Sequence, residues 1–284
     1  MFGIHKDVHK HIKTRLYVYE NMYIVVSHNY GFFSCCSVIL HYVAEYCNLY
    51  KQLPDKIDSS GSFGWYKQKE SDDITYDYFE LPNDNVIELT NNISVPFTHF
   101  HQYVDYTTLN YDIIVPFVAK YFSPSMQIRQ IISEIEQKYN LVNQYDNMCV
   151  LFHRGNDKST ETKLCSYDMI IEKARIIQSR RPGTLFLIQS DETEFIEKMT
   201  EVFPNSVYFK DEIRHIKSQI DTVDKCMSDL NYEFSKKYLA ITIIMSKCRY
   251  VICGSGNCSL WIMLYRQNAN NIIQFRDGIW HINI

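Results

Sequence analysis

The sequence predicts an α/β protein with two Rossmann-like domains that face a cleft. Its 284 residues exceed the usual size of one hydrophobic core, which favours two domains of ordinary size. A β-branched apolar run, a glycine-bearing turn and a periodic helix occur early in the chain, as at the start of a Rossmann-like domain. In the second half, strands alternate with helices, which is typical of a parallel sheet with helices on both faces.

The early pattern consists of a strand over Tyr23–Ser27, a turn at Gly31 and a helix. Apolar residues from Val38 to Tyr46 recur in that helix at three- and four-residue spacing, as in a helix packed on a sheet. A second helix is predicted over Ser125–Tyr139, because a proline suits its start and its isoleucines form one apolar face. We place the linker near residues 139–147, so that the expected domains are residues 1–143 and 144–284.

The second domain is expected to contain five strands and four main helices. The strands are predicted at Met148–His153, Thr184–Gln189, Val207–Phe209, Arg249–Cys253 and Asn271–Phe275. The helices are predicted at Tyr167–Ser179, Thr193–Phe203, Tyr232–Cys248 and Cys258–Arg266.

Composition and charge exclude several classes of protein. The net charge of -4 is spread over stretches of mixed sign, which argues against a nucleic-acid binder that depends on a basic surface. Met1–Arg15 lacks the apolar run of a signal peptide, and no window reaches the ~18 apolar residues of a membrane span. We therefore expect a cytoplasmic protein without an integral membrane segment. The cysteines form no paired CxxC motifs, which favours free thiols over disulfides or structural zinc.

The loops that follow the strands are the candidate sites, because open parallel sheets bind ligands beyond the carboxyl ends of their strands. Arg154, Asp157 and Lys158 follow the first strand of the second domain. An arginine there can present a planar fork to two phosphate oxygens, and the lysine adds a second positive charge. Ser190 and Asp191 follow the second strand, where a carboxylate can accept hydrogen bonds from a ribose or a base.

Two glycine turns complete the set of candidates. One follows the strand Arg249–Cys253, leads directly into a helix and comprises Gly254, Ser255, Gly256 and Asn257. Glycines let the backbone approach a phosphate closely, and the amides at a helix start favour negative charge. The other turn is at Gly31 in the first domain. Each candidate also has a purely structural interpretation, as an ion pair of Arg154 with Asp157, a helix cap at Asp191 or an ordinary tight turn, but their common place after strands favours ligand binding.

The strand end carrying Arg154, Asp157 and Lys158 resembles the His-x-Arg-Arg-x-Asp-Lys signature of the fucosyltransferase superfamily, which includes alpha-1,6-, nodulation and protein O-fucosyltransferases. Residues 187–192 look like that family's Thr-Asp-Asp motif and residues 245–257 like its last nucleotide-binding motif. The resemblance implies the two-domain fold called GT-B and a GDP-sugar donor, such as GDP-fucose, held mainly by the second domain. It also implies a glycan or protein acceptor on the side of the first domain, with no metal and no cofactor.

The sequence departs from the family signature at two positions. Gly155 stands where the family has its second arginine, and His153 directly precedes Arg154 instead of standing two residues before it. On a strand, that shift sends the histidine side chain to the opposite face, so His153 is expected to be a core residue, while Arg154 keeps its role. The carboxylate that the family has near the start of the final helical segment is not evident between Tyr238 and Met245. The identity of the nucleobase, and hence of the sugar-nucleotide donor, therefore stays open.

The resemblance implies a metal-independent inverting displacement. Arg154 and Lys158 would stabilise the departing diphosphate, with backbone donors from the second glycine turn, and Asp191 with Ser190 would bind the nucleotide. Glu161 is the nearest match to the family's catalytic carboxylate and would take the proton of the acceptor.

Three alternatives are left open: another sugar-nucleotide donor on the same fold, a non-catalytic relative that binds a glycan or a protein, and an unrelated dinucleotide enzyme. The last is weakened because the opening turn has one glycine rather than three. The acceptor and the oligomeric state cannot be deduced from the sequence.

Overall fold

The computed structural model of the protein describes residues 15–19, 23–82, 87–89, 93 and 103–284. These residues form two compact units. Unit 1 contains the described residues before 102 together with 110–128, and unit 2 contains residues 103–109 and 129–284. Residues 103–109 and 129–143, which the sequence prediction assigns to the first domain, therefore pack in unit 2.

Unit 1 is a small α/β unit around one long helix. Its strands and helices are β1 (Arg15–Tyr19), β2 (Tyr23–Ser27), α1 (Phe32–Tyr50), β3 (Lys56–Asp58), α2 (Thr75–Tyr78) and α3 (Tyr111–Tyr121). β2 pairs antiparallel with β1 and parallel with β3, and α1 connects the parallel pair. Aromatic rings of Phe32, Phe63 and Tyr78 pack together beside the start of α1. The predicted strand and the helix after Gly31 are confirmed, and the described part of this unit contains one parallel strand pair.

Unit 2 is built on a six-stranded sheet. Its strands are β4 (Met148–His153), β5 (Leu185–Ser190), β6 (Ser206–Val207), β7 (Tyr250–Gly254), β8 (Ile272–Arg276) and β9 (Ile279–Asn283). They lie in the order β6-β5-β4-β7-β8-β9, and all neighbours are parallel except β8 and β9. β5 and β6 follow β4 in the sequence and lie on one side of it in the sheet. β7 and β8 come later in the sequence and lie on the other side of β4. The strand order therefore reverses between β4 and β7.

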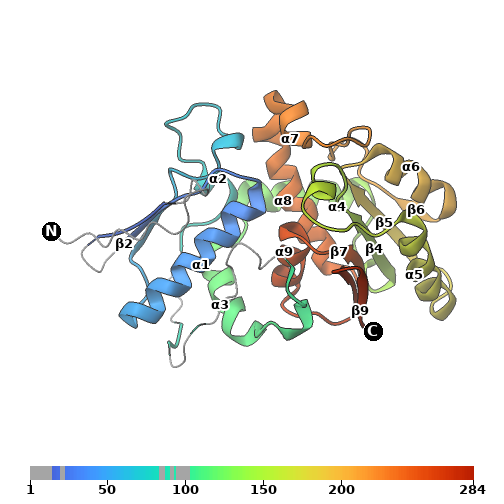
Figure 1. Ribbon diagram of the computed structural model, residues 1–284, viewed down its shortest axis with the longest axis horizontal. Helices are drawn as coiled ribbons and strands as arrows, with labels where there is room; N and C mark the ends of the chain where they lie inside the picture. The colour runs from blue at the N-terminus through green and yellow to red at the C-terminus, as the bar shows by residue number, and fades with distance from the viewer. Residues whose placement is uncertain (1–14, 20–22, 83–86, 90–92, 94–102) are drawn as a thin grey trace. The chain divides into compact units, whose positions relative to one another are not determined.

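Helices lie on both sides of this sheet (Figure 1). The helices after residue 125 are α4 (Met126–Lys138), α5 (Tyr167–Arg180), α6 (Thr193–Val202), α7 (Val223–Cys226), α8 (Asn231–Lys247) and α9 (Asn257–Arg266). α5 and α6 lie on one side, and α8 with α9 packed against it lies on the other. Because both faces are covered, all six residues of β4 are buried, which explains its unbroken apolar run. Short 3-10 helices occupy Gly64–Tyr66, Tyr106–Thr108, Tyr145–Asn147, Asn156–Thr160 and Ser228–Leu230.

The mixed α/β class is confirmed, as is the predicted alternation of strands and helices in the second half of the chain. The third strand of that half covers Ser206–Val207 and not Val207–Phe209. β1, β3 and β9 were not predicted. β9 follows a turn in which Asp277 and Gly278 have φ of 53° and 88°. Two successive residues at positive φ make the tight hairpin turn for which Asp-Gly is a preferred sequence.

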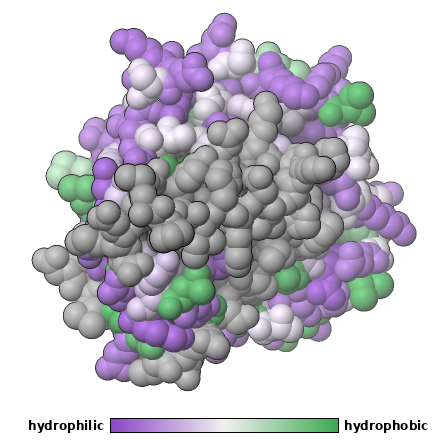
Figure 2. All heavy atoms as spheres, turned by 60° about the vertical axis from the view of Figure 1, so that its left-hand side comes forward, coloured by the Kyte–Doolittle hydropathy of each residue, from purple (hydrophilic) through white to green (hydrophobic). Residues whose placement is uncertain are grey.

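No helix within the described ranges combines the length and the apolar character needed to cross a membrane. Residues 1–14, on which the expectation about a signal peptide rests, lie outside the described residues. The coloured surface in Figure 2 is mainly hydrophilic, and its hydrophobic residues stand in small separate groups. Such isolated apolar residues are ordinary on protein surfaces.

Candidate functional site

The carboxyl ends of β4, β5 and β7 meet at one edge of the sheet of unit 2. The 3-10 helix Asn156–Thr160 follows β4, Asp191 and Glu192 follow β5, and the turn 254–256 joins β7 to α9. This edge includes the point between β4 and β7 where the strand order reverses, and open α/β sheets bind ligands at such points. Unit 2 thus contains every candidate site residue except Gly31, which precedes α1 in unit 1.

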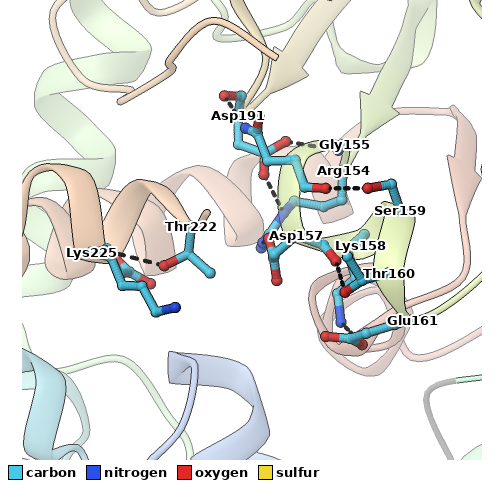
Figure 3. Close-up of polar contacts among 12 residues, drawn as sticks. Arg154, Gly155, Asp157, Lys158, Ser159, Thr160, Glu161, Asp191, Thr222 and Lys225 are labelled. Atoms are coloured by element: carbon cyan, nitrogen blue, oxygen red, sulfur yellow. Dashed lines mark hydrogen bonds and ion pairs between the residues drawn. The ribbon is translucent and has the colours of Figure 1, made fainter. Parts of the chain in front are cut away.

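Arg154 is held in place by three side chains, two of which are shown with it in Figure 3. Its Nε donates to Asp191 Oδ2 at 2.9 Å, its Nη2 donates to Asp157 Oδ1 at 3.1 Å, and its Nη1 lies 3.5 Å from the hydroxyl of Tyr238 on α8. Burial alone would lower the pKa of Arg154, but Asp191, Tyr238 and Asp157 outweigh it and raise that pKa well above its usual value. A fixed cation results, with 29% of its side chain exposed. These contacts use three of the five N–H groups of a guanidinium.

Asp191 and Ser190 already have partners within the protein. Asp191 accepts from Arg154 through Oδ2 and from the backbone N–H of Gly155 through Oδ1, at 2.9 Å in both cases. The hydroxyl of Ser190 accepts from the backbone N–H of Glu192 at 3.0 Å. We expected these two side chains to contact a nucleotide. In the structure Asp191 joins the loops after β4 and β5, because the two strands are neighbours and end at the same edge, and Ser190 bonds within the loop after β5.

His153 lies on the opposite face of the sheet from Arg154. It is buried, its ring stacks on Phe195 of α6 with centroids 4.8 Å apart, and it meets the ring of Tyr167 of α5 edge-on. Its Nε2 lies 3.0 Å from Glu192 Oε2. The core interpretation of this histidine is the one that the structure shows. The reversal of faces follows from the alternation of side chains along a strand.

Glu192 explains why the residue after Arg154 is a glycine. A Cβ atom added at Gly155 would lie 1.9 Å from the carboxyl carbon of Glu192 and within 2.3 Å of both its oxygens. That carboxylate is buried and accepts hydrogen bonds from the Tyr167 hydroxyl at 2.7 Å, the Ser218 hydroxyl at 2.8 Å and the Asn156 backbone at 3.2 Å. The space in which the second arginine of the family signature would begin is therefore filled by a carboxylate of this chain.

The buried position of Glu192 would raise its pKa, but its hydrogen bonds hold the pKa at about 2, below the ordinary value of 4.5. A carboxyl group whose pKa is lowered by folding stabilises the native state above its unfolded pKa and loses that contribution as pH falls. We expect the stabilisation by Glu192, on the order of 3 kcal/mol, to be present at neutral pH and lost as pH falls from about 4.5 to 2.

Urea denaturation of the native protein and of Glu192→Gln at several pH values checks this expectation. The native protein should be the more stable of the two at pH 7, and the difference should shrink below pH 4.5. A difference that is constant across that range would show that ionised Glu192 does not contribute this stability.

Lys158 of the 3-10 helix forms an ion pair with Glu161, the residue after that helix, with Nζ 2.5 Å from Oε2. The hydroxyl of Tyr103, from the segment 103–109, donates to the same carboxylate oxygen at 3.1 Å. Burial would raise the pKa of Glu161, but Lys158 and Tyr103 outweigh it and lower that pKa. A lowered pKa weakens a carboxylate as a general base.

The glycine turn after β7 is tied to the segment 103–109. The Tyr106 hydroxyl accepts from the backbone N–H of Gly256 at 3.0 Å and donates to its carbonyl at 3.1 Å. The backbone N–H of Ser255 donates to Phe275 at 3.0 Å. Two of the backbone donors that we expected this turn to offer a ligand are therefore already used. Asn257 is the first residue of α9.

The two glycines of this turn are not required by the packing of the protein itself. Neither lies in the left-handed region, since Gly256 has an extended φ of 167°, and a Cβ atom added at Gly254 or Gly256 would meet no atom within 4 Å. Open space therefore lies next to both glycines. The same holds for Gly31 in unit 1.

A small cavity lies at the carboxyl ends of β4, β7 and β8. Its volume is about 20 Å³, enough for one water molecule, and it is lined by Phe152, His153, Arg154, Thr162, Lys163, Leu164, Cys165, Gly254, Ser255, Ser259 and Phe275. It therefore brings the loop after β4, with Arg154, next to the glycine turn after β7.

Sequence reasoning gave no role to Glu192, Tyr106, Tyr238 or Lys163. Glu192 stands directly after Asp191, where its partners could not be foreseen because they come from three other segments. Tyr106 contacts Gly256 across 150 residues of sequence and comes from a part of the chain with weak periodicity. Lys163 was detectable only as a lysine five residues beyond Lys158.

All nine cysteines are free thiols, and Cys226 is the exposed one. Across the part of the chain that the structure covers, no group of three or more His, Cys, Asp or Glu side chains is placed to hold a metal ion.

Neither the family models nor the curated proteins contain a match to this chain. Solved structures of NodZ alpha-1,6-fucosyltransferase are similar to part of it. The structure soaked with GDP-fucose has 11% identity and a TM-score of 0.41, over 62% of this chain and 55% of that chain. The structure co-crystallised with GDP has 11% identity and a TM-score of 0.39, over 57% and 49%. NodZ from Bradyrhizobium has 12% identity and a TM-score of 0.37, over 57% and 48%.

The matched region thus spans about half the length of these fucosyltransferases. A similarity of this size leaves the activity to be argued from the residues of the site.

Proposed function

We propose that this chain is a fucosyltransferase-like glycosyltransferase that binds a nucleotide-sugar donor at the carboxyl ends of β4 and β7. The observation that carries the proposal is the position of Arg154. It is a partly exposed cation, fixed by Asp191 and Asp157, at the edge where the strand order reverses. Ligands of open α/β sheets bind at this place, and arginine suits bidentate contact with phosphate oxygens.

The chemistry of sugar transfer needs such a group. Breaking the bond between the anomeric carbon and the phosphate leaves negative charge on the departing diphosphate, and a cation already in place stabilises that charge without reorganisation. Arg154 is the proposed group, with Lys158 as a second cation. The open space beside Gly254 and Gly256 adjoins the start of α9, where the helix dipole favours a negative charge. The donor would be GDP-fucose or another nucleotide sugar.

An inverting displacement also needs a base to take the proton of the acceptor hydroxyl. Glu161 is the proposed base. Its ion pair with Lys158 lowers its pKa, so it becomes a stronger base when Lys158 turns towards another anion. A bound diphosphate is such an anion.

The rest of the proposal follows the sequence resemblance. Domains 1–143 and 144–284 would form a GT-B enzyme, with a glycan or protein acceptor approaching from the first domain on the side of Gly31. Asp191 would hydrogen-bond the nucleotide, with Ser190 beside it. The transfer would need no metal.

A thermal-shift titration against GDP, UDP, ADP, CMP and GDP-fucose, with a chelator present, tests the proposal. A ligand that binds only the native state raises the free energy of unfolding, and with it the melting temperature, by mass action. The gain in free energy is about 2.7 kcal/mol at a hundredfold excess over Kd. We expect GDP compounds to stabilise the protein selectively. Selective stabilisation by another nucleotide would change the donor. No response to any of them would reject the proposal and favour a protein that binds a glycan or a partner without catalysis.

A further inference from the structure

The charges around Arg154 do not by themselves favour an anion. Arg154 faces the two carboxylates of Asp191 and Asp157, and Lys158 faces Glu161. Two positive and three negative side chains leave this group with a formal charge of -1. A diphosphate carries at least two negative charges, so a donor site here needs another cation that the protein has not already neutralised.

Lys163 meets this requirement. It lines the same small cavity as Arg154 and Ser255, on the loop that follows the 3-10 helix. Within the described residues, it makes no hydrogen bond or ion pair with any side chain or backbone atom. Arg154 and Lys163 are the only arginine and lysine side chains among the described residues that line this cavity.

The neighbourhood of Lys163 places its ammonium group at the ligand-binding edge of the sheet. A Cβ atom added at Gly278 would lie 3.5 Å from Lys163 Nζ, so the ammonium lies against the turn between β8 and β9. That turn follows the carboxyl end of β8, which is parallel to β7. The ammonium therefore lies at the same edge as Gly254 and Arg154.

We propose that Lys163 binds the diphosphate of the donor together with Arg154, since both cations line the small cavity. The inference rests on the proposed function and names a ligand of the diphosphate that the sequence motifs do not contain. The cavity holds about one water molecule, so the diphosphate lies at its opening, within reach of a long lysine side chain. Lys163 then supplies the uncompensated charge, while Arg154 supplies a fixed direction of hydrogen bonding.

Isothermal titration of GDP and of guanosine into the native protein and four variants tests this inference. The variants are Lys163→Gln, Lys163→Arg, Arg154→Ala and, as a matched control, Lys173→Gln. Lys173 lies on α5, close to Trp280 of the same hairpin, with its charge paired to Glu172 at 2.9 Å, and it does not line the cavity. If the thermal-shift panel identifies another base, its nucleoside diphosphate and nucleoside replace GDP and guanosine.

We expect Lys163→Gln to weaken GDP binding about tenfold or more, because a charge-assisted contact is lost, and to leave guanosine binding unchanged. Lys163→Arg should retain most of the affinity, and Lys173→Gln should match the native protein. Unchanged GDP affinity in Lys163→Gln, with loss in Arg154→Ala, would overturn this inference and leave the proposed function intact. Equal losses for GDP and guanosine would also overturn it. A native protein that binds no nucleoside diphosphate would remove the proposed function, and this inference with it.

Discussion

Replacing Arg154 with alanine is expected to lower the turnover of sugar transfer at least about 100-fold. The expected loss is that of removing one preorganised donor from a site where negative charge develops. Arg154→Lys should also lose most of the activity, because an ammonium group cannot reproduce the planar fork that Asp191 and Asp157 hold in position. Turnover is measured with the donor that the thermal-shift panel identifies.

The same substitution leaves Asp191 and Asp157 without their cation, so a loss of stability has to be separated from a loss of catalysis. Arg175→Ala, at an exposed position of α5, is the matched control and should leave turnover unchanged. Thermal denaturation of each variant identifies the temperatures at which it is folded, and turnover is compared there. Near-normal turnover in folded Arg154→Ala would remove Arg154 from the mechanism and leave it as the centre of an ion-pair cluster.

The fold of unit 2 was predictable because its signals are local. β4, β5 and β7 each begin with a run of four or five apolar residues, and polar or glycine residues and then a helix follow each run. The ends of unit 2 were harder to predict. β9 is the edge strand and none of its residues is buried, with Ile279 and Ile282 more than half exposed. Such a strand lacks the apolar run that identifies a central one.

The candidate site was predictable in position but not in its contacts. Arg154, Asp191 and the turn at Gly254 follow strands, and the parallel sheet brings them to one edge. Their partners depend on the order of those strands, which the sequence does not state. Nucleotide binding by Asp191 stays a prediction, whereas its contacts within the protein were not foreseen: because β5 lies directly beside β4, its carboxylate holds Arg154 and the backbone of Gly155.

The glycine at position 155 shows the same limit. From the sequence alone it is a missing arginine, which suggests a weakened phosphate site. In the structure it is the consequence of a buried carboxylate, since Glu192 occupies the space that any side chain at 155 would enter. The glycine at position 155 and the buried carboxylate of Glu192 therefore depend on each other, because a side chain at 155 and this carboxylate would occupy the same space.

This pairing predicts a large and specific loss of stability. Gly155→Ala should destabilise the protein by about 3 kcal/mol or more, because its Cβ would displace the Glu192 carboxylate from the hydrogen bonds that it accepts. Gly254→Ala is the matched control, since its Cβ would meet no atom within 4 Å, and it should cost less than about 1 kcal/mol. Urea denaturation at neutral pH measures both.

A double-mutant cycle separates this steric explanation from a general intolerance of the loop. Glu192→Ala alone should be strongly destabilising, because His153, Tyr167 and Ser218 lose a common partner. Adding Gly155→Ala to that variant should cost far less than it does in the native protein, because the carboxylate that it would strike is gone. We expect a coupling energy of about 2 kcal/mol or more between the two positions. Additive losses would mean that another constraint keeps residue 155 a glycine, and the absence of the second arginine would then need a reason other than the carboxylate of Glu192.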